Sequence, residues 1–224
     1  GYGKILGHNK SLSIDSLEES ELDYIDNLET LATLKRYNFN DLSDTQKITH
    51  KIAIFDTEND IKEFEEFRYH SYPFNQISGN HLGLVEFMTD THPIRNVREA
   101  EDYIERVKLF DESLSANLIW LEEQKKLGIF APKFVFDHVI RQLYELINYK
   151  DDENPLMQIF VKKVSSLGIN DDQVNNLVSE LSAVIKSDVK PGFKLILDYM
   201  EENYVSSNVN HGVWSLPNGN EFYA

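Results

Sequence analysis

The sequence predicts an all-α protein, a multi-helix array with long antiparallel helices and ordered connecting loops. Apolar residues recur at spacings of three and four along most of the 224 residues. Asn, Ser and Asp residues stand immediately before these stretches, where they can cap a helix, and no stretch alternates apolar and polar residues as a strand does. Hydrophobic residues make up 41% of the chain and aromatics 12%, which is enough to build a substantial core.

Two helices are expected in the first 67 residues. Asp15–Glu18 is a capping pattern in which Asp15 accepts from the amide at Glu18, and an apolar stripe follows it to about residue 37. Ser43–Gln46 repeats the pattern and opens a second helix that runs to Phe67. We expect a helical hairpin over residues 1–66.

The longest helix is expected over residues 97–127. Asn96 is its cap, and Gly128 ends it. At 1.5 Å per residue, about 30 residues give a helix of roughly 45 Å. A helix of this length needs a long antiparallel partner, and Lys133–Asn148 is the stretch expected to supply part of it.

Three further helices are expected beyond residue 150. They cover residues 156–167, 170–185 and 191–204, with Gly168 ending the first and Asn170 capping the second. The third helix is expected to start at Pro191. The residues after Tyr204 are expected to form a loop.

Residues 68–81 carry the best local candidate for a site. This stretch has no helical period and contains Pro, Gly, two His and three carboxamides, which favours an ordered loop. Its polar side chains are typical of a pocket that hydrogen-bonds a peptide-like ligand. The alternative is purely structural, with carboxamides satisfying turn amides and rings packing at a helix junction. The candidate substrate-binding residues are His70, Tyr72, Asn75, Gln76 and His81.

Composition and motifs exclude several classes of function. The formal charge is −16, and acidic residues outnumber basic ones in every third of the chain, which argues against nucleic acid and anionic membranes as partners. The chain has no Cys, no HExxH, no G-x-S-x-G and no P-loop, and no apolar run approaches the roughly 18 residues of a membrane span. Glu65 and Glu66 with His70 could form a metal site at a helix end, although such acidic positions are more often a solvated face.

Several segments together resemble the N-terminal half of the DUF885 family of bacterial proteins, whose members are often lipoproteins or secreted proteins. The resemblance runs from about residue 67 to the end of the sequence, in the order of the family. The segments that carry it are Phe67–His70, Tyr72–Gly79, Thr91–Arg95, Ala100–Tyr103, Ile129–Val135 and Leu216–Tyr223.

This resemblance implies an activity that the chain itself does not contain. DUF885 proteins look like zinc metallopeptidase relatives, with a HExxGH-type motif in the C-terminal half. On that reading residues 1–224 are the helical N-terminal region of a larger protein, with 67–224 as the family-matching part and no cofactor of its own. Its partners would be its own C-terminal half, which would hold the zinc, and a peptide-like substrate that Asn75 and Gln76 bind.

The resemblance also implies a location, and other readings stay open beside it. Family members of the lipoprotein type are exported, so the periplasm or cell envelope is expected, with the cytoplasm as the alternative. The chain is then one wall of the substrate cleft in an envelope hydrolase. The main rival is a non-catalytic helical binding or scaffold module, and a third reading is a complete small enzyme that uses Glu65, Glu66 and His70.

Overall fold

The computed structural model describes residues 10–207, 209 and 212–223, and these residues form helices and connecting turns without a strand. The prediction of an all-α fold is confirmed. None of the described helices has the length and apolar content needed to cross a membrane. The α-helices are α1 (Leu17–Leu34), α2 (Asp44–Lys62), α3 (Asn80–Glu86), α4 (Val97–Lys108), α5 (Phe110–Lys126), α6 (Lys133–Asn148), α7 (Pro155–Ser165), α8 (Asp171–Val184), α9 (Lys190–Asn203) and α10 (Gly219–Tyr223).

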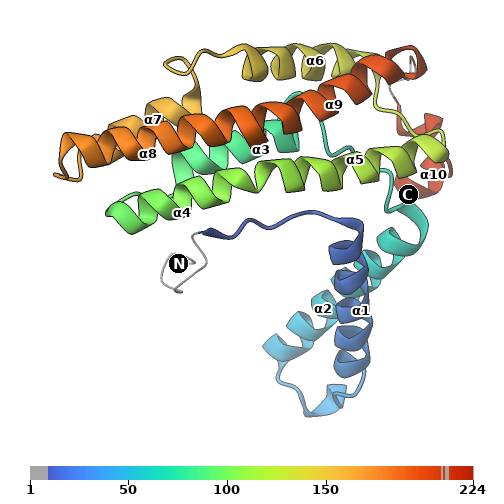
Figure 1. Ribbon diagram of the computed structural model, residues 1–224. Coiled ribbons are helices and arrows are strands. Elements are labelled where there is room, and N and C mark those ends of the chain that lie inside the picture. Colours follow the sequence, from blue (N-terminus) through green and yellow to red (C-terminus); the bar gives the residue numbers. More distant parts are fainter. Residues whose placement is uncertain (1–9, 208, 210–211, 224) are drawn as a thin grey trace.

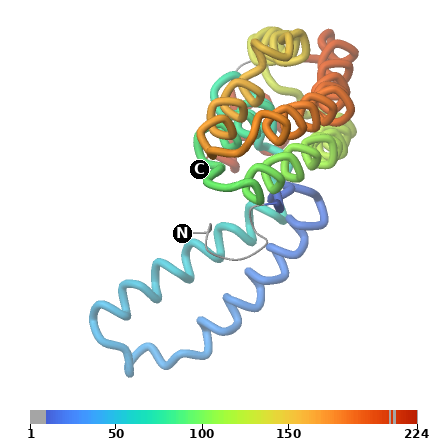
Figure 2. Tube along the Cα trace, turned by 60° about the vertical axis from the view of Figure 1, so that its left-hand side comes forward, coloured from blue at the N-terminus to red at the C-terminus, as the bar shows by residue number. Residues whose placement is uncertain are grey.

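Helices α1 and α2 form an antiparallel hairpin that projects from a layered helical body (Figures 1 and 2). Near its tip Lys35 pairs with Glu58 at 2.9 Å, and at its base the rings of Tyr24 and Phe64 stack with their centroids 4.3 Å apart. Helix α1 has no buried residue. The hairpin is therefore held by its own seam and by its base, and much of its surface is left uncovered.

The capping residues are those that the sequence predicts, except at α1, where the cap lies one residue later. Ser43 and Gln46 form the expected capping box, and Asn96 accepts from the amide of Glu99 as a cap should. At α1 the prediction was wrong by one residue, because Ser16 and not Asp15 is the cap, with its hydroxyl 3.0 Å from the amide of Glu19. The acidic side chains that follow then occupy the first turn, where they complement the helix dipole.

The predicted helix over residues 97–127 is two helices, α4 and α5, that meet at Leu109. The amide of Leu109 donates to the carbonyl of Arg106, which tightens the turn, and α5 continues in nearly the same direction (Figure 1). Its main partner is α9, which runs parallel to it: Phe110 packs on Phe193, and further along the hydroxyl of Tyr199 donates to the carbonyl of Leu121. The expected antiparallel pairing with Lys133–Asn148 is thus corrected.

Helix α6 packs antiparallel to α9. The ring of Phe136, near its start, contacts Tyr204, and Tyr144 near its end bonds Glu201. Helices α8 and α9 are joined by a π-helical turn, Ile185–Val189, so they form one nearly continuous rod rather than the two separate helices expected. The wider turn tolerates Pro191, because a proline lacks the amide that a regular α-helix would use.

The core of the body contains 30 buried hydrophobic residues among those described, drawn chiefly from α4, α5, α6, α7, α8 and α9. The segment that follows α2 crosses from the hairpin to this body. A π-helical turn, Glu63–Phe67, begins the crossing, turns follow to Gly79, and α3 starts at Asn80. His81 consequently lies in the first turn of α3 and not in the loop expected over residues 68–81.

Candidate functional site

The crossing segment is buried at His70. The His70 side chain is 7% exposed, and its Nε2 lies 2.6 Å from the carbonyl oxygen of Pro217. A carbonyl only accepts, so Nε2 carries the proton and donates. The ring also packs on Phe67 and Phe222, at centroid distances of 5.3 and 5.1 Å. His70 therefore joins the crossing segment to the C-terminal segment.

Tyr72 bonds a distant backbone carbonyl, whereas Asn75 stabilises its own turn. The hydroxyl of Tyr72 donates to the carbonyl of Phe130 at 3.3 Å, and burial raises the pKa of this phenol. The side-chain oxygen of Asn75 accepts from the amides of Ile77 and Ser78 at 3.0 and 2.8 Å. This is the Asx-turn arrangement, and it employs the oxygen that a peptide ligand would otherwise use.

Gln76 and His81 meet at Gln142 on α6. Nε2 of His81 is 2.9 Å from Oε1 of Gln142, whose Nε2 donates to the backbone carbonyl of Gln76 at 3.1 Å. Burial lowers the pKa of His81. Nδ1 of His81 and Oε1 of Gln76 are buried and have no hydrogen-bond partner among the described residues. The five predicted residues are thus divided: His70 faces the C-terminal segment, and Gln76 and His81 face α6.

Two residues that sequence reasoning missed fix the crossing segment. Gln124 is 2% exposed, and its Nε2 donates to the carbonyls of Tyr69 and Ser71 at 2.7 and 2.8 Å. Gln142 likewise donates to the backbone carbonyl of Gln76. The sequence could have indicated Gln124, because it lies on the same face of α5 as the buried residues Leu114 and Leu121. A carboxamide buried on such a face needs a hydrogen-bond partner from another part of the chain.

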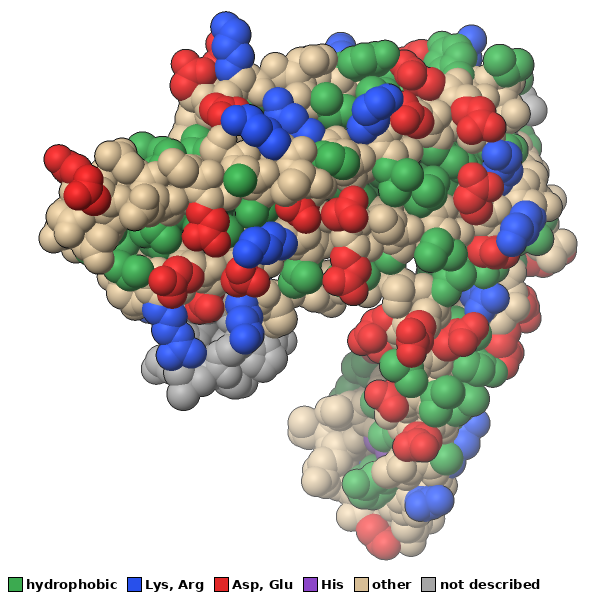
Figure 3. Space-filling model, in the orientation of Figure 1, with side chains coloured by type: hydrophobic (Ala, Val, Ile, Leu, Met, Phe, Trp, Pro, Cys, Tyr) green, Lys and Arg blue, Asp and Glu red, His purple; other side chains and the backbone are tan. Residues whose placement is uncertain are grey.

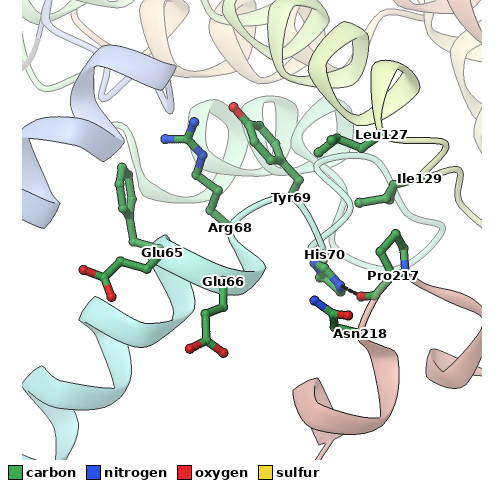
Figure 4. Close-up of a pocket in the computed structure, with 10 residues that line it drawn as sticks. Glu65, Glu66, Arg68, Tyr69, His70, Leu127, Ile129, Pro217 and Asn218 are labelled. Atoms are coloured by element: carbon green, nitrogen blue, oxygen red, sulfur yellow. Dashed lines mark hydrogen bonds between the residues drawn. The ribbon is translucent and has the colours of Figure 1, made fainter.

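A cavity of about 600 Å³ lies where the hairpin base, the crossing segment, the turn after α5 and the C-terminal segment meet (Figure 4). We call it the junction cavity. Glu65 and Glu66 come from the π-helical turn, an element that is common at functional sites. The residues that line it are Phe64, Glu65, Glu66, Arg68, Tyr69, His70, Leu127, Ile129, Pro217 and Asn218.

A second cavity of about 280 Å³ lies between the hairpin and the body, and we call it the hairpin cavity. Phe64 and Arg68 line both cavities and so separate them. The hairpin cavity is lined by three further carboxylates and by two other aromatic side chains. Its residues are Ser20, Asp23, Tyr24, Asn27, Asp60, Glu63, Phe64, Arg68, Ser71 and Trp120.

The charged groups of the junction cavity are held by neighbours. The hydroxyl of Tyr24 donates to Oε1 of Glu65 at 2.6 Å, and this bond raises the pKa of Tyr24. The guanidinium carbon of Arg68 lies 4.8 Å from the ring centre of Phe64 and 4.7 Å from that of Tyr69. Arg68 and Glu65 each have a fixed position, and they form no ion pair with each other.

The described residues do not fit a zinc ion. Glu65, Glu66 and His70 do line one cavity, as the metal-site reading requires. However, residues 10–207, 209 and 212–223 contain no group of three His, Asp or Glu side chains arranged to hold a metal. His70 in particular uses Nε2 for the Pro217 carbonyl, and its Nδ1 is closed off from solvent.

Comparisons with known proteins place this geometry in context. A family model described as a bacterial protein of unknown function (DUF885) matches residues 3–224, so the match includes the hairpin, upstream of the motifs that begin at Phe67. No curated protein matches the sequence. Among solved structures, a "putative lipoprotein" from Colwellia psychrerythraea is similar, with a TM-score of 0.87 at 20% identity. The similarity covers 96% of this chain and only 38% of that one.

Proposed function

The chain belongs to the DUF885 family, and from this premise we propose that it is the helical N-terminal portion of a longer zinc-dependent, peptidase-like hydrolase. In this proposal the chain forms one wall of the substrate cleft, and the metal is bound by residues outside it. The junction cavity is the part of that wall that faces the peptide.

The observation that carries the proposal is the difference in coverage with the similar solved structure. Nearly all of this chain superimposes on that protein, whereas more than half of that protein lies outside the match. A region of that size is ample for a catalytic half.

The junction cavity supports the peptide-facing part of the proposal. Its volume of about 600 Å³ lies within the range of pockets that bind small organic ligands, roughly 300–1,000 Å³. Apolar walls at Leu127 and Ile129 face carboxylates and a guanidinium, a mixture suited to a chain with apolar side groups and charged ends. The lipoprotein description of the structural neighbour favours the cell envelope as the location.

A peptide hydrolysis assay tests this proposal. We expect a longer DUF885 protein carrying this chain at its N-terminal end to cleave peptides with zinc bound, and to lose that activity on chelation. The 224-residue chain alone is expected to leave the same peptides intact. Metal-dependent cleavage by the chain alone would instead support a complete small enzyme.

The alternative function is a non-catalytic binding or scaffold module, and one observation favours it. Ile48, Ile52 and Phe55 follow one another along the outward face of α2 and are 62%, 54% and 65% exposed. An apolar stripe of this kind often marks an interaction surface. If the zinc-loaded longer protein binds peptides but cleaves none, the binding module becomes the better description.

A further inference from the structure

We propose that Arg68 is the carboxylate anchor of the junction cavity and that, with Glu65, it selects short peptides carrying opposite charges at their two ends. The inference rests on the proposed function, because it names the ligand that the peptide-facing wall would hold. It assigns the carboxylate of the peptide to Arg68 and the ammonium group to the acidic pair Glu65 and Glu66.

Two aromatic rings lie beside the guanidinium of Arg68. Its central carbon lies over the rings of Phe64 and Tyr69, at 4.8 and 4.7 Å from their centres. The N–H groups of a guanidinium point outward in its plane, which is the geometry that binds a carboxylate with two parallel hydrogen bonds. The ring contacts therefore hold Arg68 without using its N–H donors in a hydrogen bond.

The N–H groups of Arg68 have no partner among the described residues. Arg68 forms no ion pair or hydrogen bond through its side chain with any described residue, although carboxylates line both cavities beside it. Glu65 is three positions away along the chain, a spacing at which opposite charges on a helix ordinarily pair. Arg68 is partly buried and has no carboxylate partner, although the chain carries a formal charge of −16. Its guanidinium is therefore available to bind the carboxylate of a ligand.

Glu65 is bound by a residue other than Arg68. Tyr24, which reaches over from α1, donates to the Glu65 carboxylate at 2.6 Å and itself stacks on Phe64. Phe64 therefore contacts both Tyr24, which holds Glu65, and Arg68. Two opposite charges are thus held apart in one cavity, and Figure 4 shows the Arg68 and Glu65 side chains extending in different directions.

The acidic surroundings define which anions fit. Glu65 and Glu66 line the same cavity as Arg68, so their negative charges disfavour a multiply charged anion such as phosphate. A peptide with one carboxylate and one ammonium group satisfies both charges. The same carboxylate could come from the C-terminus or from an Asp or Glu side chain, and the experiment below separates these sources.

Isothermal titration of the 224-residue chain with four forms of one tripeptide tests the inference. The first three are trialanine with free ends, its C-terminal amide and its N-acetyl derivative. The fourth is the C-terminal amide of Ala-Asp-Ala with a free N-terminus. We expect free trialanine to bind at least about tenfold more tightly than its amide, since a charge-assisted bidentate bond is lost. The acetylated form is expected to bind more weakly too. Recovery of affinity by the aspartate amide would identify a side-chain carboxylate as sufficient.

Variants identify the residue responsible. Arg68→Gln is expected to remove the difference between trialanine and its amide, and Arg68→Lys to restore only part of it, because an ammonium lacks the fork. Arg98→Gln is the matched control, since Arg98 is exposed on α4 and lines neither cavity. Circular dichroism and the midpoint of thermal unfolding verify that each variant folds.

Three results would overturn the inference: equal binding of trialanine and its amide to the unmodified chain, a difference that survives in Arg68→Gln, or no binding at all. The first result needs no variant, so a folding defect cannot obscure it. None of the three touches peptide cleavage by the longer zinc-loaded protein. If Arg68→Gln leaves that cleavage unchanged, the proposed function stands and the anchor is refuted.

Discussion

Acidification is expected to destabilise this fold through His92, which lies in the turn before α4. The ring is 1% exposed, and its Nδ1 is 2.8 Å from Nη1 of Arg106. A guanidinium only donates, so Nδ1 is the acceptor and the proton is on Nε2, which donates to the carbonyl of Glu99 at 3.2 Å. Protonating Nδ1 would break the Arg106 bond and add a positive charge beside Arg106 and Lys163.

The sign and size of the effect follow from the pKa of His92. Burial, aided by the charges of Arg106 and Lys163, lowers this pKa from 6.5 to about 4. Between these values the unfolded chain binds a proton that the folded chain does not, so stability falls as the pH falls through this window. At 1.36 kcal/mol per pH unit the interval corresponds to about 3 kcal/mol, and to about 2 kcal/mol after allowance for solvent screening.

Urea unfolding at pH 7.5, 6.0, 5.0 and 4.5 measures this effect. His92→Gln keeps an acceptor and a donor but cannot titrate, so the unmodified chain should lose about 2 kcal/mol more than the variant between the highest and lowest pH. His81 and the carboxylates titrate in both proteins and cancel in the comparison. Identical pH dependence of the His92→Gln variant and the unmodified chain would refute the reasoning.

Three further predictions concern residues that position the site. Gln124→Leu removes two hydrogen bonds to the crossing segment and should lower the free energy of unfolding in urea by about 2 kcal/mol. The control Gln158→Leu removes one exposed hydrogen bond and should lower it by under about 1 kcal/mol. Equal losses would contradict the role assigned to Gln124. Gly192→Ala places a methyl 2.9 Å from Leu114 at the α5–α9 contact and should lower the melting temperature. The methyl of Gly83→Ala meets nothing within 4 Å, so this variant should keep or raise the melting temperature. A lower melting temperature for Gly83→Ala than for Gly192→Ala would be inconsistent with this packing. Ile52→Lys on the outward face of α2 should change the stability of the chain by less than about 0.5 kcal/mol. A larger loss in urea unfolding would mean that Ile52 is covered in solution.

The sequence could predict many residues of the candidate site but not how they are arranged in space. The sequence singled out the right segment, since the crossing residues that border the junction cavity include His70, and Glu65 and Glu66 were noted beside it. It did not indicate Arg68 or Gln124. Arg68 matters because of rings that stack on it, and Gln124 because it reaches backbone carbonyls more than 50 residues away along the chain.

The sequence by itself determined the helical class, most helix boundaries and the family. These follow from local causes, because a cap such as Ser43 or Asn96 acts within one turn and an apolar stripe is a property of one helix. Only the tertiary structure decided that α5 pairs with α9 in parallel, that a π-helical turn ahead of Pro191 joins α8 to α9, and that His70 and His81 face different neighbours. An apolar stripe specifies that a helix is covered but not by which helix or in which direction, and a buried polar side chain does not specify its distant partner.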